Sequence, residues 1–273
     1  MTSRRRKYTR RALIGAGILT GGCVAVSGGS NLLFQNASEP ISTVGDVAFD
    51  HPLAIPPLID PEPDREGRKH FDLTLQAGET EILPGRMTAT WGVNGSFLGP
   101  TIRARRGDRV AMSVTNALPE LTTLHWHGMH LPAIADGGPH QPIDEGVTWE
   151  PEWEIIQPAS TLWYHPHPHG KTAEHVYRGI AGMIVIDDDE SDALGLPDEY
   201  GVDDIPLIIQ DKNFDDDGQL DFDTGSFFDN FSGSPAFGIF GDTTLANGTM
   251  GAYFEATRRL TRFRILNGAN TRF

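Results

Sequence analysis

The sequence has 273 residues, of which 38% are hydrophobic, and its formal net charge is -15 at pH 7. Six of the 22 basic residues fall within the first thirty positions, which contain no acidic residue, so the rest of the chain carries 16 basic and 37 acidic residues. This acidic excess argues against nucleic acid as a partner, because phosphate binding depends on basic patches. The length allows one large or two ordinary domains.

Lysine is scarce in this sequence, with four residues against 18 arginines. An acidic, lysine-poor surface is typical of a protein that works in high salt, where dense carboxylates hold water and their mutual repulsion is screened. An ordinary acidic secreted protein would show a similar balance of charge. The composition leaves both interpretations open.

Residues 1–27 have the organisation of a twin-arginine-type signal peptide. Arg10 and Arg11 follow a basic stretch and precede an apolar run of small residues from Gly15 to Val26. This run is shorter than the roughly twenty residues that a membrane span needs. We therefore predict no transmembrane span in the mature form, with a permanent anchor as the alternative. Export by the twin-arginine route would deliver an extracellular, periplasmic or cell-surface protein.

Cys23 is the only cysteine of the chain. It lies at the end of the apolar run, where the cysteine of a lipobox would carry a lipid, although Thr20 departs from the leucine expected at the start of that motif. Lipid anchoring at Cys23 is thus an alternative to free secretion. A single cysteine permits no intrachain disulfide and leaves the folded body without a thiolate ligand.

Residues 28–66 are predicted to form a proline-rich linker that continues as an extended arm, because proline is incompatible with regular helix. From residue 67 onward, apolar and polar residues alternate in short runs that favour β-strands. Glycine and proline, at 31 and 19 residues, separate these runs and favour an all-β Greek-key sandwich or barrel. The predicted strands cover residues 71–75, 110–114, 122–127, 149–156, 161–165 and 182–186.

The acidic run 187–192 marks a predicted junction between a first domain, residues 67–190, and a second domain, residues 191–273. A long surface loop is the alternative interpretation of that run. Strands are predicted again at residues 205–210 and 262–267. The stretch of about eighty residues is short for a closed sandwich, so the second domain is expected to be incomplete.

An acidic stretch in this second part mimics half of a calcium-binding loop. Asn213, Asp215 and Asp217 have the spacing of the first ligands of an EF-hand. Thr224 stands where such a loop requires its bidentate glutamate. We predict an acidic turn without a calcium site.

Two histidine clusters carry the functional information. The segments 125–127 and 165–167 each hold two histidines two positions apart. Residues i and i+2 of a strand face the same side, so two such pairs on neighbouring strands would bring four imidazoles together. Neutral imidazole suits copper, zinc, iron or nickel, and copper has the highest intrinsic affinity for nitrogen sites. The predicted metal ligands are His125, His127, His165 and His167.

The segments His125–Gly128 and Trp163–His167 resemble the two N-terminal copper-binding motifs of the multicopper oxidases, the family that includes laccases and bacterial copper efflux oxidases. The similarity continues through other segments from about residue 70 to the end, including residues 99–108, 136–139 and 262–270. The resemblance implies cupredoxin-like Greek-key β-sandwich domains, one complete and a second incomplete. It also implies a trinuclear copper cluster at which O2 is reduced to water.

The resemblance assigns a role to each histidine of the two motifs. It implies that His125 is a ligand of the type 2 copper and that His127, His165 and His167 bind the type 3 pair. Asp136 matches the acid that orients copper-bound water and helps to deliver protons. A turn-forming aspartate before two glycines is the alternative for Asp136.

The remaining histidines have weaker support. His169 is expected to form a hydrogen bond and not to bind metal, since the family uses two histidines from this motif. His130, His140 and His175 match no motif and are expected to be loop or surface histidines.

The sequence departs from the family beyond the second histidine cluster. A complete oxidase has a third cupredoxin domain, which supplies the other trinuclear ligands and the cysteine of the type 1 copper. Here no histidine is found after His175 and no cysteine after Cys23. We therefore expect half of a trinuclear site and no type 1 site, in the N-terminal portion of an oxidase that is inactive by itself.

The expected partners are the missing C-terminal cupredoxin domain, O2 and a small reducing substrate, either a phenol or Cu(I). The alternative is a non-catalytic protein on the same scaffold, such as a cell-envelope division protein or a copper-binding module.

Overall fold

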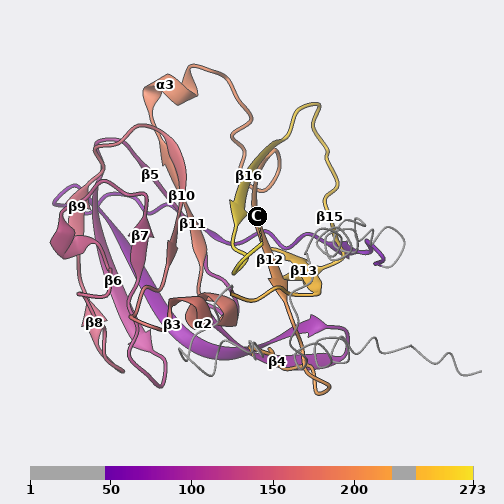
Figure 1. Ribbon diagram of the computed structural model, residues 1–273. Helices are drawn as coiled ribbons and strands as arrows, with labels where there is room; N and C mark the ends of the chain where they lie inside the picture. Colours follow the sequence, from indigo (N-terminus) through magenta and orange to yellow (C-terminus); the bar gives the residue numbers. More distant parts are fainter. Residues whose placement is uncertain (1–46, 223–237, 273) are drawn as a thin grey trace, which may run out of the picture. The chain divides into compact units, whose positions relative to one another are not determined.

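The computed structural model describes residues 47–222 and 238–272, which fold mainly as β-strands (Figure 1). The predicted signal peptide, Cys23 and the first part of the predicted linker lie outside these residues. Contacts group Val47–Phe273 as one unit, and the domain boundary expected after residue 190 stays a prediction. No helix within residues 47–222 and 238–272 is long and apolar enough to cross a membrane.

Two sheets build the sandwich that carries the histidines. The first has the strand order β2-β5-β11-β10-β7. Its strands are Leu58–Ile59 (β2), Thr101–Arg105 (β5), Gly182–Asp187 (β11), Ser160–His165 (β10) and His125–His127 (β7). The second has the order β4-β3-β6-β8, with β9 also paired to β6. Its strands are Arg86–Val93 (β4), Arg68–Leu83 (β3), Arg109–Ala117 (β6), Thr148–Trp149 (β8) and Glu152–Glu154 (β9).

The apolar core of this sandwich follows from the alternation along its strands. On β3, Phe71, Leu73 and Leu75 are at most 1% exposed, whereas Asp72 between them faces solvent. They pack in one cluster with Trp126 of β7 and Tyr164 of β10. Burying each large side chain contributes about 1.5–3 kcal/mol relative to leaving it exposed. The core confirms the predicted all-β sandwich.

A third sheet has the order β14-β13-β12-β16. Its strands are Asp204–Lys212 (β12), Thr243–Ala246 (β13), Thr249–Met250 (β14) and Arg262–Asn267 (β16). Strand β11 is buried along its whole length, because Ile184 and Ile186 belong to the sandwich core while Met183 packs against Ile208 of β12. A continuous apolar run is what a strand covered on both faces requires.

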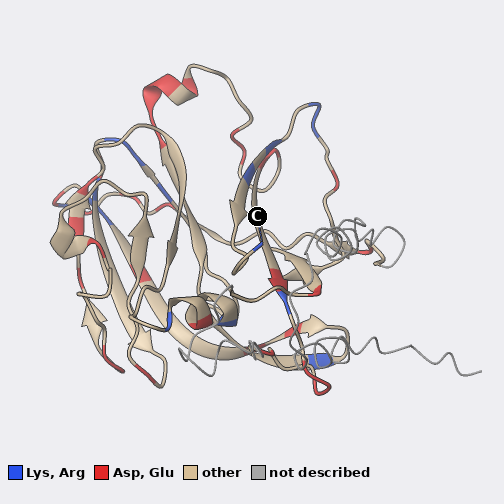
Figure 2. Cartoon of the chain, viewed as in Figure 1, with Lys and Arg blue, Asp and Glu red and all other residues tan. Residues whose placement is uncertain are grey.

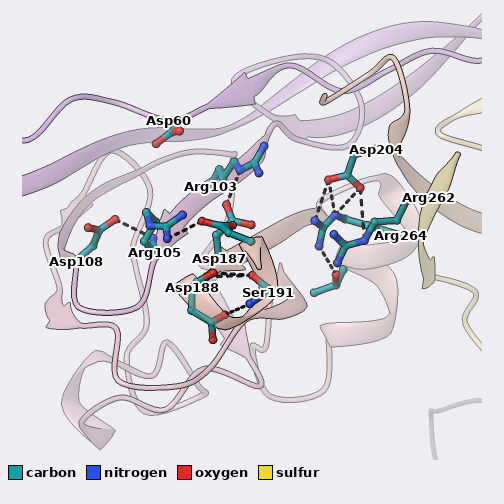
Figure 3. A network of polar contacts seen from close by, with 12 residues as sticks. Asp60, Arg103, Arg105, Asp108, Asp187, Asp188, Ser191, Asp204, Arg262 and Arg264 are labelled. Carbon is teal, nitrogen blue, oxygen red and sulfur yellow. Dashed lines mark hydrogen bonds and ion pairs between the residues drawn. The ribbon is translucent and has the colours of Figure 1, made fainter. Parts of the chain in front are cut away.

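A buried ion pair lies within the third sheet, and its arginine also bonds to the sandwich (Figure 3). Arg264 of β16 donates from Nε and Nη2 to the carboxylate of Asp204 at 2.8–2.9 Å, and its Nη1 donates to Oγ1 of Thr161 on β10 at 2.9 Å. Asp204 is 1% exposed and Arg264 is 5% exposed. The charges are therefore fully paired in a region that excludes water.

The proline-rich arm ends in two short strands. Leu58–Ile59 (β2) extends the edge of the first sheet beside β5. His51–Pro52 (β1) pairs with Ala252–Tyr253 (β15). The described part of the arm therefore lies extended, as its prolines predict.

Two acidic segments have local structural roles. The acidic run forms the short helix Asp189–Asp192 (α3), which is mostly red in Figure 2. The side chain of Asp188 caps this helix, and Arg105 of β5 forms ion pairs with Asp189 and Asp192. Further on, Asp215 Oδ1 accepts hydrogen bonds from the backbone N–H groups of Asp217 and Gln219. This carboxylate is used within a turn, in agreement with the predicted acidic turn.

Several elements differ from the sequence-based expectations. The strand expected at residues 122–127 begins only at His125, with Thr122 in an isolated bridge to Ile143. The strand expected at residues 149–156 is divided at Pro151 into β8 and β9, since proline cannot donate to a ladder. Strands β4, β5 and β13 and the helix Thr172–Arg178 (α2) were not predicted.

Candidate metal centre

The pairing of β7 with β10 determines which side chains share a face. His125 lies opposite His165, Trp126 opposite Tyr164, and His127 opposite Trp163. Because opposed residues of an antiparallel pair point the same way, the histidines project from one face and Trp126 and Tyr164 from the other. Trp126 and Tyr164 are fully buried in the core, which fixes the strand so that the imidazoles face outward.

The four predicted ligands lie together. The ring centroid of His125 lies 5.6 Å from that of His127, 5.4 Å from that of His165 and 5.6 Å from that of His167. Within the described residues, ligand atoms of His125, His127 and His165 all lie within 4.8 Å of one another, and His167 stands outside that group. Such a spacing matches a shared metal environment built from imidazole nitrogens.

Backbone carbonyls orient two of the rings. Nδ1 of His125 lies 2.9 Å from the carbonyl oxygen of Asp136, and Nδ1 of His165 lies 2.8 Å from that of Pro166. Since a carbonyl can only accept, each Nδ1 carries a hydrogen, so that Nε2 is the ring nitrogen available to a metal. Metal-binding histidines characteristically donate their other N–H to a carbonyl or carboxylate in this way.

The pKa shifts of two histidines in the cluster also favour metal binding. Burial lowers the pKa of His165 to about 4, against the opposite effect of its bond to Pro166. Burial, together with the nearby His125 and His167, also lowers the pKa of His127. Nδ1 of His127 and Nε2 of His165 are 3.2 Å apart. Neutral imidazoles at neutral pH are the form that binds transition metals, so the residues present fit a copper ion.

Trp163 covers one side of the cluster. Its ring stacks on His165 at a centroid distance of 4.1 Å and lies 5.4 Å from His127. It also packs, as Leu266 of β16 does, against the buried apolar cluster that includes Ile208 of β12. Trp163 therefore restrains the orientations of two imidazoles from the direction of the third sheet.

Asp136 approaches His125 through both backbone and side chain. It follows the 3-10 helix Ala133–Ala135 (η2), and its Oδ2 lies 3.3 Å from Nδ1 of His125. The next residue, Gly137, has φ +72°, and a Cβ there would lie 1.8 Å from the carbonyl oxygen of Leu124. Glycine is therefore required for this loop to come so close to β7.

His167 is held by the segment that precedes β7. Its backbone N–H donates to Oγ1 of Thr123 at 2.7 Å, and Thr123 is fully buried. Pro166, between His165 and His167, is also buried. The second histidine segment is thereby tied to the first.

His175 does not match its prediction. It was expected to be a loop or surface histidine, but it lies in α2 with no exposed surface. Its Nδ1 lies 3.0 Å from Oγ1 of Thr122 and its Nε2 lies 2.8 Å from Oε1 of Glu120. Val176 and Tyr177, the next two residues of α2, are also buried, so the C-terminal turn of this helix faces inward. His130, His140 and His169 are exposed.

Comparison with protein families gives a consistent result. Residues 74–191 match the family model described as multicopper oxidase. The chain is 39% identical over 220 residues to the multicopper oxidase mco of Staphylococcus aureus, covering 81% of this chain and 47% of that protein. It is equally 39% identical over 221 residues to the cell division protein FtsP of Escherichia coli, covering 81% of this chain and 44% of that protein.

Solved structures of multicopper oxidases share the fold of this chain. A laccase from Pediococcus acidilactici matches with a TM-score of 0.73 and 38% identity, over 80% of this chain and 46% of that one. The McoA multicopper oxidase from Aquifex aeolicus matches with a TM-score of 0.70 and 38% identity, over 80% of this chain and 46% of that one. The predicted cupredoxin-like sandwich is confirmed. The chain spans about half the length of the relatives it matches.

Proposed function

Because the chain belongs to the multicopper oxidase family, we propose that its histidine cluster binds copper and forms half of a trinuclear site for the reduction of O2 to water. The observation that carries this proposal is the common face of His125, His127 and His165, with their ligand atoms within 4.8 Å. Bound copper would supply one-electron chemistry, coupling oxidation of a phenolic or metal-ion substrate to the four-electron reduction of O2.

The roles proposed for the side chains follow the resemblance and fit the hydrogen bonds. His125 serves the type 2 copper, and His127, His165 and His167 serve the type 3 pair. Carbonyl groups hold His125 and His165 in the tautomer that leaves Nε2 free to bind. Asp136, within 3.3 Å of His125, holds that ring and is the group available to accept or deliver a proton beside it.

The remaining ligands are assigned to polypeptide outside this sequence, in a C-terminal cupredoxin domain. The sequence contains a single cysteine and no histidine after His175, so it has no type 1 copper site. This chain alone is accordingly proposed to be inactive toward phenols. Its twin-arginine-type N-terminus supports export of the protein, with lipid anchoring at Cys23 as one form of attachment.

Copper binding by the full chain tests this function. Titration with Cu(II), followed by electron paramagnetic resonance and visible absorption, should show nitrogen ligands and no intense thiolate-to-copper absorption band. His165→Gln should weaken binding by at least about tenfold, because it removes a buried, preoriented imidazole. His140→Gln, which changes an exposed histidine outside the cluster, is the matched control and should bind as the wild type does.

A second candidate is a non-catalytic envelope protein, and the equal identity to the cell division protein FtsP supports it. The two candidates differ in their need for metal. If His165→Gln loses no more Cu(II) affinity than His140→Gln, the proposed copper site is contradicted. The scaffold function would then be the better proposal.

A further inference from the structure

The buried His175 is bonded at both ring nitrogens. Its Nε2 lies 2.8 Å from Oε1 of Glu120 and its Nδ1 lies 3.0 Å from Oγ1 of Thr122. A carboxylate can only accept, so Nε2–H donates to Glu120, while Nδ1 lies within hydrogen-bond distance of the Thr122 hydroxyl, which also lies 3.3 Å from the carbonyl oxygen of Thr123. Burial lowers the pKa of His175, with Glu120 acting in the opposite direction. The contacts at its two nitrogens hold the ring in one orientation.

Glu120 also bonds to the segment that carries the second histidine pair. Its Oε2 forms an ion pair with Nζ of Lys171, whose own backbone N–H donates to the carbonyl of Pro168. The backbone carbonyl of Glu120 accepts from Nδ2 of the buried Asn116. Glu120 is thus fixed by β6 on one side and by the end of the second histidine segment on the other.

Few backbone bonds hold the segment between β6 and β7. Strand β6 ends at Ala117 and β7 begins at His125, and between them Thr122 pairs only with Ile143 in an isolated bridge. Side chains must therefore supply much of the restraint on residues 118–124. Thr123 in that segment accepts the backbone N–H of His167.

These bonds connect the positions of His125 and His167. Movement of residues 120–123 would displace the acceptor of the His167 N–H and, two residues further on, His125 itself. The centroids of these two rings lie 5.6 Å apart. A change well below 1 Å at a metal ligand is sufficient to matter, because distances in a site must hold within about 0.2 Å.

We propose that Glu120 and His175 are positioning residues of the copper site: together they hold residues 120–123 against residues 167–171 and so set the spacing of His125 and His167. The copper part of this inference rests on the function proposed above. The restraint on His167 belongs to the metal-free protein and is measurable there.

Two substitutions and one rescue variant test the proposal in the full chain. Glu120→Ala and His175→Ala each remove one member of the pair. His175→Gln retains a donor toward Glu120 and an acceptor toward Thr122. Glu174→Gln is the matched control, since it breaks the ion pair with Arg178 on the same helix and leaves the bonds of His175 in place.

Hydrogen exchange of the metal-free protein gives the first measurement. The His167 amide should exchange at least about tenfold faster in both alanine variants, while the amide of Ile184 within β11 keeps its rate, because only the local restraint is lost. His175→Gln should recover most of the protection, and Glu174→Gln should leave it unchanged. Equal rates at His167 in Glu120→Ala and the wild type would overturn the proposal.

Cu(II) affinity gives the second measurement. Both alanine variants should bind Cu(II) about 10–100-fold more weakly than the wild type, the range found when groups behind metal ligands are removed. His175→Gln should again recover most of the loss. Faster exchange with unchanged affinity would reduce the pair to a purely structural role and overturn its link to copper.

The two proposals fail separately. If the wild type binds no copper, the proposed function fails, and the positioning of His167 is then decided by exchange alone. If His175→Ala does not fold, Glu120→Ala decides, because the Glu120 side chain is 29% exposed and its truncation leaves a smaller defect.

Discussion

The histidine-bearing sandwich and the β12–β16 sheet bury their side chains in different ways. In the sandwich, both sheets direct large apolar residues inward, and Phe71, Trp126 and Tyr164 are fully buried. In the β12–β16 sheet the face toward β11 is covered, where Ile208 is 1% exposed, whereas the other face of β16 leaves Phe263 44% and Ile265 66% exposed.

The inner face of the second region also contains buried charged groups. Asp204 and Arg264 form their ion pair there, and Lys212 is 1% exposed with its Nζ bonded to the carbonyl of Tyr177. The Nζ of Lys212 also lies 4.2 Å from the centroid of the Tyr177 ring. The sandwich is therefore stabilised mainly by its apolar core, whereas the β12–β16 sheet depends on docking against β11 and on paired charges.

Replacing a phenylalanine with alanine in each of the two regions should give the largest difference in unfolding free energy. Phe71→Ala should cost about 3–5 kcal/mol of unfolding free energy, because it opens a cavity in a fully packed core. Phe263→Ala should cost about 1 kcal/mol or less, because that side chain is 44% exposed. Urea denaturation followed by fluorescence and circular dichroism would measure both, and equal losses would contradict the comparison.

Breaking the buried ion pair between Asp204 and Arg264 should have the next largest effect on unfolding free energy. Asp204→Ala leaves the charge of Arg264 buried with only Thr161 as a partner and should cost about 3–5 kcal/mol. The exposed pair of Arg258 and Glu199 is the control, and Arg258→Met should change stability by less than about 1 kcal/mol. The double variant Asp204→Leu/Arg264→Met should recover most of the loss in urea denaturation, since it removes both charges. A double variant as unstable as Asp204→Ala would show that packing, and not the unpaired charge, dominates.

The burial of Lys212 should have a smaller effect on stability, and this effect should depend on pH. Burial lowers its pKa from 10.5 to about 7, with Asp211 acting in the opposite direction. Between these values the unfolded chain binds more protons than the folded one, so this group makes stability rise as pH increases from about 7 to about 10.5.

Lys212→Met should therefore stabilise the protein below pH 7, by about 1–4 kcal/mol, and the gain should shrink toward zero above pH 10. Denaturation of the wild type and the variant across this range measures the difference. A gain that does not vary with pH would indicate that the effect comes from packing.

Local rules made much of the sandwich predictable from sequence. The alternation in residues 71–75 and the apolar run 182–186 correspond to parts of β3 and β11, because a strand facing one or two covered layers requires those patterns. Strand β4 was missed because its buried positions include Thr88 and Thr90, which an apolar pattern does not identify. Pro151 divided a predicted strand for a reason that was visible in the sequence.

In the candidate site, too, some features follow from local sequence and others arise only in the folded chain. The i, i+2 spacing within each histidine pair is a local property, and it alone indicated that His125 and His127 share a face. The closeness of His127 and His165, which are 38 positions apart, depends on the register between β7 and β10. The partners of His175 lie more than fifty positions away, so no local pattern could reveal them.

The sequence by itself determined the chemistry of this protein: two pairs of imidazoles, a single cysteine at position 23, and an alternating β pattern that resembles one family. The tertiary structure decided the geometry, namely which face the imidazoles share, which carbonyls orient two of the rings, and that His175 is buried. The reason is physical. Side-chain identity and strand periodicity are encoded within a few residues, whereas register, burial and hydrogen-bond partners are set by segments that meet only after folding.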